Sequence, residues 1–207
     1  VTIRTFQPHA KEVHLLLADQ SIGMTKTFQE GLFETVLPVD KLTDPSLDPF
    51  SYRYEILFHS GVIITTNDPY RFPVLLGEQD RFLFNAGRNY KIYDHLGAHR
   101  TDCHNIAGTV FRTWAPNAKA VSVIGNFNGW DGRVHPMRSL GASGIWELFI
   151  PHLQEEEIYK FQIKTQQGNN LEKSDPYQFY GELRPKSGSV VKAIDNYTWN
   201  DQQWQNA

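Results

Sequence analysis

Apolar and polar side chains alternate along several short stretches of the chain. In residues 159–164, and again in residues 52–58, an aromatic or aliphatic side chain occupies every second position. This period of two is typical of a β-strand with one buried face. Turn-forming Gly, Pro, Asn and Asp residues separate these stretches, and no long segment keeps a helical period. The pattern therefore predicts antiparallel β-sandwiches and not a bundle of long helices.

The strand pattern occurs twice. Residues 4–13 align with residues 112–121 at an offset of 108, and six of the ten positions are identical. Three further pairs of segments follow in the same order: 31–38 with 144–151, 52–56 with 159–163, and 68–72 with 175–179. Four matches in one order predict two copies of a single module. The second copy carries five additional residues between its first two matching segments.

We therefore predict an all-β protein of two tandem immunoglobulin-like antiparallel β-sandwiches joined by a packed connector. The predicted boundaries are 1–72 for the first module, 73–105 for the connector, 106–196 for the second module and 197–207 for a tail. Within the connector, residues 77–84 predict a short helix that ends at residues 85–87. A flexible linker would be rich in Gly and Ser. This segment instead carries large apolar side chains that need burial: Leu75, Leu76, Phe82, Leu83, Phe84, Tyr90 and Tyr93.

The charge balance excludes some classes of partner. The chain has 207 residues, with 20 Lys and Arg against 23 Asp and Glu, and its formal net charge is −3. Such a balance gives no electrostatic attraction for nucleic acid or an anionic membrane, and no apolar run is long enough to span a bilayer. The single cysteine, Cys103, excludes an internal disulfide and fits a reducing compartment. We therefore expect a cytoplasmic protein with no nucleic acid and no membrane as a partner.

The two copies differ in their aromatic side chains, because all five tryptophans lie in the second copy or in the tail. Trp130 lies in residues 125–132, which are rich in Asn and Gly and predict a surface turn. An exposed indole can stack on the apolar face of a glucose ring, while amide and ammonium groups hydrogen-bond its hydroxyls. The turn thus favours contact with a neutral sugar polymer; the alternative is an apolar plug over the sandwich edge. Trp114 and Trp146 lie in alternating patterns and are expected in the core.

Four potential metal ligands, His95, His99, Cys103 and His104, lie within ten residues. Their spacing is compatible with zinc, but no clear tetrahedral motif accompanies it, so we expect no metal. The sequence contains no phosphate-binding loop, nucleotide-binding fingerprint or nucleophile elbow. We therefore expect no cofactor.

The second copy resembles carbohydrate-binding modules of family 48 in four segments: 111–118 (FRTWAPNA), 125–130 (GNFNGW), 144–147 (GIWE) and 159–161 (YKF). A longer set of similar segments runs from 68–72 (DPYRF) through 93–99 (YDHLGAH) to Arg184 and Pro185. This set resembles bacterial glycogen branching enzymes, which are 1,4-alpha-glucan branching enzymes with two such sandwiches in tandem before a catalytic barrel. The resemblance covers essentially the whole chain.

That resemblance implies a non-catalytic accessory fragment of an enzyme of glycogen biosynthesis. The family transfers an alpha-1,4-glucan segment to an alpha-1,6 branch point. Its catalytic (β/α)8 barrel takes about 250 residues and has no counterpart in this sequence, so no catalytic residue is assigned. The tail at 197–207 is expected to lead into that barrel, against which the fragment would pack.

The resemblance also implies where glucan would bind. The stacking indole and the lysine of the family's sugar platform match Trp130 and Lys160, with Asn128 and Asn170 as polar candidates nearby in the motifs. A second platform aromatic, expected shortly after Gly168, is absent, and its loss can lower affinity about tenfold. Two alternatives stay open. One is a self-sufficient starch- or glycogen-binding protein, and the other is a purely structural region that sets stability, oligomeric state or transferred chain length without binding sugar.

Overall fold

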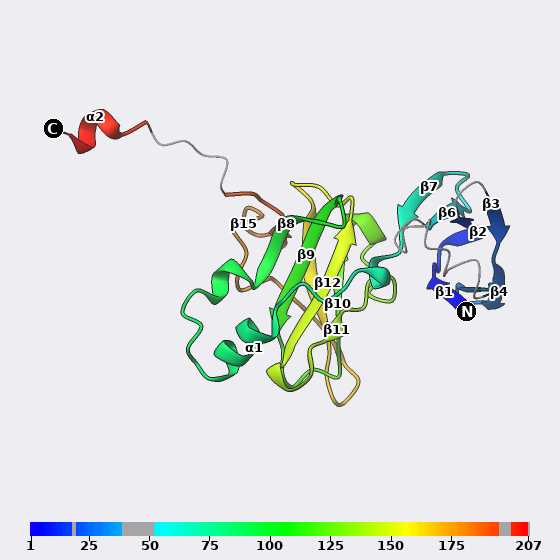
Figure 1. Cartoon of the computed structure of the whole chain (residues 1–207), viewed down its shortest axis with the longest axis horizontal. Helices are drawn as coiled ribbons and strands as arrows, with labels where there is room; N and C mark the ends of the chain where they lie inside the picture. The colour runs from blue at the N-terminus through cyan, green and yellow to red at the C-terminus, as the bar shows by residue number, and fades with distance from the viewer. Residues whose placement is uncertain (18–19, 39–51, 195–199, 207) are drawn as a thin grey trace.

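The computed structural model describes residues 1–17, 20–38, 52–194 and 200–206. Figure 1 shows two separate groups of strands, an N-terminal group in blue and cyan and a larger one in green to orange. All the strand pairs within the described residues are antiparallel. No helix in this part of the chain is long and apolar enough to cross a membrane. The predicted all-β architecture of two sandwiches is confirmed.

The first module is a sandwich of a three-stranded and a four-stranded sheet. Its strands are β1 (Thr2–Phe6), β2 (Ala10–Leu17), β3 (Gln20–Gly23), β4 (Thr25–Phe28), β5 (Leu32–Val36), β6 (Arg53–Phe58) and β7 (Ile63–Asn67). One sheet has the order β1-β5-β4 and the other the order β3-β2-β6-β7. Alternate residues such as Leu15, Phe33 and Ile56 point between the sheets and form the core, as the period of two requires.

The second module repeats this plan with more strands. They are β8 (Gly97–Cys103), β9 (Ile106–Trp114), β10 (Ala120–Gly125), β11 (Arg138–Ser139), β12 (Ile145–Pro151), β13 (Ile158–Lys164), β14 (Asn170–Lys173), β15 (Tyr180–Gly181) and β16 (Ser189–Val190). One sheet has the order β11-β12-β9-β8; in the other, β10-β13-β16-β15, the strand β14 also pairs with β13. The core between them includes Phe111, Val123 and Phe161.

The boundary between connector and second module differs from the predicted one. Residues 97–103 fall within the predicted connector at 73–105, yet they form β8 and pair with β9 along their whole length. Strand pairing therefore places them in the second module. The sequence pattern missed this strand because its polar residues, such as His99 and Arg100, lie on a half-covered sheet edge.

The duplication extends to the pairing register. β1 pairs with β5 as β9 pairs with β12, and β2 pairs with β6 as β10 pairs with β13. Arg4 lies opposite Glu34 in the first module, and Arg112 lies opposite Glu147 in the second. Matching sequence segments thus occupy matching positions in the two sandwiches.

A buried tyrosine–aspartate pair also occurs in both copies. The Tyr52 hydroxyl donates to Asp68 Oδ2 at 2.6 Å, and the Tyr159 hydroxyl donates to Asp175 Oδ2 at 2.6 Å. In each copy the other carboxylate oxygen accepts the backbone N–H two residues further on, at 2.9 and 2.8 Å. The aspartate therefore fixes the turn that follows β7 in the first module and β14 in the second.

The connector packs on the second module. The 3-10 turn η2 (Pro69–Arg71) leads into it. The connector itself contains the helix α1 (Glu78–Asn85), which confirms the predicted short helix, and the turn η3 (Ile92–Asp94). Leu76 and Leu96 are buried against Leu140 and Ile145 of the second module. The burial expected for Phe82, Tyr90 and Tyr93 is wrong, because these three side chains are exposed.

The two strand tryptophans of the second module have different surroundings. Trp146 packs on the core and donates from Nε1 to the Ala115 carbonyl at 3.0 Å. Trp114, also expected in the core, is 54% exposed. It lies two residues after Arg112 and so shares the outer face of β9 with that residue, next to the Phe84 ring of α1 at 6.1 Å.

The tail is described only in part. Residues 195–199, which include Trp199 and the predicted boundary at residue 196, lie outside the described residues, as does residue 207. Residues Gln202–Gln205 form the short helix α2 (Figure 1), and Trp204 within it is exposed.

Candidate functional site

Trp130 lies in a tight surface turn after β10. The 3-10 turn η4 (Asn126–Asn128) is followed by two residues with left-handed backbone, Gly129 at φ +61° and Trp130 at φ +60°. The Trp130 backbone N–H closes the turn onto the Gly125 carbonyl at 2.9 Å. Its Nε1 donates to Asn126 Oδ1 at 2.9 Å, and the residue is 37% exposed. The indole is therefore held in one orientation by its polar edge while part of it faces solvent.

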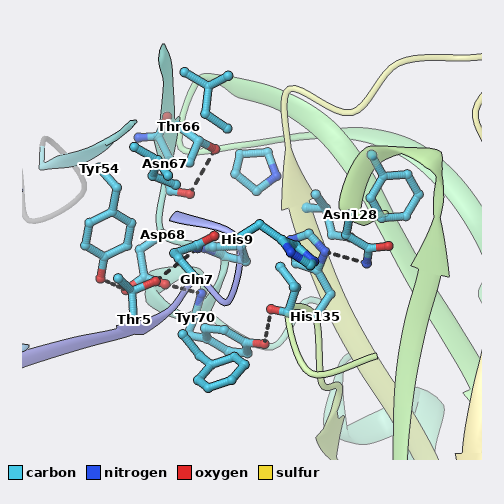
Figure 2. A pocket seen from close by; sticks show the side chains of 18 of the residues that line it. Thr5, Gln7, His9, Tyr54, Thr66, Asn67, Asp68, Tyr70, Asn128 and His135 are labelled. Atoms are coloured by element: carbon cyan, nitrogen blue, oxygen red, sulfur yellow. Dashed lines mark hydrogen bonds between the residues drawn. The ribbon is translucent and has the colours of Figure 1, made fainter. Parts of the chain in front are cut away.

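Asn128 has a different role in the same turn. It is 8% exposed, and its Oδ1 accepts the Gly125 N–H at 2.9 Å. Its Nδ2 donates to the Val123 carbonyl at 2.9 Å and to His135 Nδ1 at 2.9 Å; Figure 2 shows the contact with His135. Both amide hydrogens are used in this way, so Asn128 shapes the turn that presents Trp130.

Lys160 lies at the same end of the sheet as Trp130. It is opposite Ile124 on β10, one residue before the Gly125 that Trp130 contacts. Its neighbours in β13, Tyr159 and Phe161, point into the core, so the lysine side chain points away from the core.

Asn170 lies elsewhere on that sheet. It is exposed at the start of β14 and pairs with Lys164. Lys164 is four residues from Lys160 along β13, a separation of about 13 Å at the usual rise of a strand. The structure thus brings Trp130 and Lys160 to one end of the sheet and places Asn170 at the other.

The first module contains no tryptophan, and its most exposed described aromatic side chain is Phe28 on β4. The large aromatic side chains of Tyr52, Tyr54 and Phe33 are buried in its core. Burial and the Asp68 carboxylate raise the pKa of Tyr52 and Tyr54 far above that of a free tyrosine. These hydroxyls therefore act as permanent hydrogen-bond donors within the fold.

A cavity of about 390 Å³ lies where the two modules meet (Figure 2). Its walls come from both modules, and hydrogen bonds join the two walls. The Tyr70 hydroxyl donates to the Pro136 carbonyl at 3.0 Å, and His152 Nε2 lies 2.7 Å from Asn67 Oδ1. Sequence reasoning missed this site, because neither module's strand pattern contains information about how the modules meet.

The histidine and cysteine residues of the connector do not converge. In the described part of the chain, no group of three or more His, Cys, Asp or Glu side chains is arranged to hold a metal ion. His95 Nε2 instead lies 3.5 Å from Asp80, and His99 Nε2 lies 2.9 Å from the Leu96 carbonyl. Cys103 is buried, and burial raises the pKa of its thiol, which makes it less reactive.

Comparison with known families covers both modules. Residues 1–70 match the model of the alpha-1,4-glucan branching enzyme GlgB N-terminal domain. Residues 95–178 match carbohydrate-binding module 48, described as the isoamylase N-terminal domain. The chain corresponds to the N-terminal region of 1,4-alpha-glucan branching enzymes. The second match begins just before β8, in agreement with the pairing of that strand.

Individual relatives cover nearly the whole chain. The 1,4-alpha-glucan branching enzyme GlgB of Gloeobacter violaceus is 46% identical over 204 residues, which are 98% of this chain and 27% of that protein. The GlgB of Synechococcus sp. strain JA-2-3B'a(2-13) is 44% identical over 209 residues, with the same coverage. The chain thus spans about 27% of the length of these branching enzymes. A pullulanase structure from Anoxybacillus sp. LM18-11 aligns over 92% of the chain and 26% of its own, at 18% identity and a TM-score of 0.40.

Proposed function

We propose that the chain is the non-catalytic region of a glycogen branching enzyme that holds alpha-glucan, with Trp130 and Lys160 as the contact. The observation that carries the proposal is the exposed indole of Trp130, which is fixed at its polar edge by Asn126. A fixed ring loses little conformational freedom when a sugar stacks on it. Lys160, at the same end of the sheet, supplies three hydrogen-bond donors for hydroxyl groups.

The proposed contact is small. One indole and one ammonium group form a single stacking surface, and Asn170 lies about 13 Å further along the sheet, within reach only of a longer oligosaccharide. We therefore expect weak binding to a single glucan chain. Glycogen should be retained more strongly, because each particle offers many equivalent chains. The remainder of the proposal is that the parent enzyme transfers alpha-1,4 segments to alpha-1,6 branch points and that its barrel packs on this region. A cytoplasmic location is also proposed, supported by one free, buried cysteine, Cys103.

Electrophoresis of the chain in native gels containing glycogen tests the proposal. Wild-type protein should be retarded, and Trp130→Ala should weaken the apparent affinity about tenfold, the value of one lost stacking surface. Trp114→Ala is the matched control, because Trp114 is also exposed in the second module but lies on the opposite sheet. Lys160→Met should weaken retardation by a smaller factor.

The purely structural role makes the opposite prediction. If wild-type protein migrates at the same rate with and without glycogen, or if Trp130→Ala and Trp114→Ala reduce retardation equally, the proposed contact is wrong. Asn128→Ala adds a separate check, because its amide organises the turn. Its loss should release Trp130 and reduce binding without removing a group that touches sugar.

A further inference from the structure

The first module leaves part of its interior open beside β7. Its four-stranded sheet ends with β7, and the facing sheet has three strands in the part of the module that the structure describes. Ile64 and Thr66 of β7 lie opposite Ile56 and Tyr54 of β6, so they share the face that carries the core. Ile64 is nevertheless 41% exposed. The intermodule cavity lies at this open edge, between β7 and residues of β1.

The second module covers this opening without filling it. Residues from segments 127–136 and 150–153 form the opposite wall. Side-chain contacts join the modules beside the cavity. The Tyr70 hydroxyl donates to the Pro136 carbonyl, and the Arg133 guanidinium lies 5.6 Å from the Phe6 ring. The space that remains, about 390 Å³, lies within the range of pockets that bind small molecules.

The cavity wall contains an available hydrogen-bond donor. Because Asn128 Oδ1 accepts the Gly125 N–H, its Nδ2 must be the donor to His135 Nδ1. A neutral His135 ring therefore carries its proton on Nε2, and Nε2 has no hydrogen-bond partner among the residues that the structure describes. The side chains of Thr66 and Gln7 add polar groups to the same wall (Figure 2).

The charged groups that line the cavity are already compensated. Asp68 accepts hydrogen bonds from two tyrosine hydroxyls and one backbone N–H. Arg133 forms three hydrogen bonds to the Asp131 carboxylate, and His9 Nε2 lies 3.7 Å from the same group. A ligand would therefore find no unpaired charge to neutralise. Apolar walls supply the rest of the surface: Ile56, Phe58, Ile64, Pro69, Pro136 and Pro151.

We propose that this intermodule cavity is a second binding site, for a neutral, hydroxyl-rich molecule of the size of a mono- or disaccharide. Apolar walls with a few separate donors and acceptors suit a ring that has C–H faces and a rim of hydroxyls. The choice of an alpha-glucan end as the occupant rests on the proposed function, whereas the site itself does not depend on Trp130. Because its walls come from both modules, an occupant would tie the two together.

Isothermal titration of the chain with maltose tests the proposal. Wild-type protein should bind saturably, and Ile64→Trp, which fills the cavity from the first module, should weaken binding at least tenfold. Val134→Trp, which fills it from the second module, should have the same effect and guards against misfolding of either variant. Ile63→Trp is the matched control, because Ile63 is exposed on the other face of the same strand and should leave binding unchanged.

Comparison of the variants in both binding assays separates this site from the Trp130 contact. Trp130→Ala should keep maltose binding, and Ile64→Trp should keep retardation by glycogen. Absence of maltose binding to wild-type protein, equal loss in Ile63→Trp, or loss in Trp130→Ala with retention in Ile64→Trp would each overturn the cavity site. Tighter binding of glucose 1-phosphate than of maltose would also overturn it, because the proposal requires an uncharged ligand.

Discussion

The two modules contain the same ion pair in different surroundings. Arg4 and Glu34 of the first module are joined from Nε to Oε2 at 2.5 Å, and so are Arg112 and Glu147 of the second. The first pair has side chains 62% and 27% exposed, whereas the second has side chains 7% and 4% exposed. The sequence positions, the strand pairing and the contact are equivalent. The two ion pairs differ only in how far other parts of the chain cover them from solvent.

The connector causes that difference. It crosses the outer face of β9 and β12, where Glu147 accepts the backbone N–H groups of Leu75 and Leu76 at 2.7 and 2.9 Å. Arg112 in turn donates to the His95 carbonyl at 3.1 Å. An ion pair that lies on the surface of one module thus binds the connector to the other. Duplicated residues keep their geometry, but their energetic importance depends on what later covers them.

We expect the largest effect from removal of Glu147, the acidic partner in the buried ion pair. Glu147→Ala should destabilise the second module by about 3–5 kcal/mol, because it leaves the Arg112 charge buried and unpaired. Glu34→Ala should cost the first module about 1 kcal/mol or less, because water can solvate Arg4. Urea unfolding measures both: circular dichroism follows the first module, and tryptophan fluorescence follows the second module and tail, where all five tryptophans lie. Equal losses in the two variants would contradict the proposed role of the connector.

Acid should destabilise the second module through His135. Burial lowers the pKa of His135 to about 4, whereas an unfolded histidine titrates near 6.5. Between these values the unfolded state binds the additional proton, so the free energy of unfolding falls as the pH falls, by on the order of 3 kcal/mol in total. His135 lies in the part of the second copy that is longer than its counterpart.

Substitution of His135 by asparagine tests whether this histidine causes the loss of stability in acid. In His135→Asn the Asn128 amide keeps an acceptor, but the titrating group is gone, so the loss of stability between pH 6.5 and 4 should become smaller. Asp175 has the opposite effect in the wild-type protein and in the variant. Burial raises its pKa in the folded state, so the folded state binds a proton more readily than the unfolded state, and the free energy of unfolding rises as the pH falls. An identical pH dependence of urea midpoints in wild-type and variant would show that His135 does not titrate in this way.

The repeat could be predicted from the sequence, because strand periodicity and turn residues are local properties of the chain. Segment matches predicted the two sandwiches, and the short helix before residue 85 followed from its own pattern. Periodicity alone could not decide which face of a strand points inward. Trp114 was therefore expected in the core although it shares the outer face with Arg112.

The candidate site was predictable only in part. A turn rich in Asn and Gly correctly indicated an exposed Trp130. The same composition could not tell that the Asn128 amide is used within the turn. The cavity between the modules was beyond prediction, because it results from two surfaces far apart in sequence, such as Ile64 and His135.

The smallest expected effect concerns the paired tyrosines. Tyr159→Phe removes the hydroxyl bonded to Asp175 Oδ2, so a buried carboxylate oxygen loses its donor at a cost of about 1–3 kcal/mol. Tyr52→Phe should cost less, because Tyr54 also donates to Asp68 Oδ2 at 3.1 Å. The two substitutions are chemically identical and differ only in this additional donor.

A double variant sharpens this comparison. Tyr52→Phe combined with Tyr54→Phe removes both hydroxyls from Asp68, and the cost in the first module should then rise to that of Tyr159→Phe in the second. Urea unfolding of the three variants, followed by circular dichroism, measures the differences. If Tyr52→Phe alone is as costly as Tyr159→Phe, Tyr54 does not compensate and the hydroxyl bonded at 2.6 Å satisfies Asp68 by itself. The duplicated pairs would then be equivalent in energy as well as in geometry, unlike the ion pairs on the other sheets.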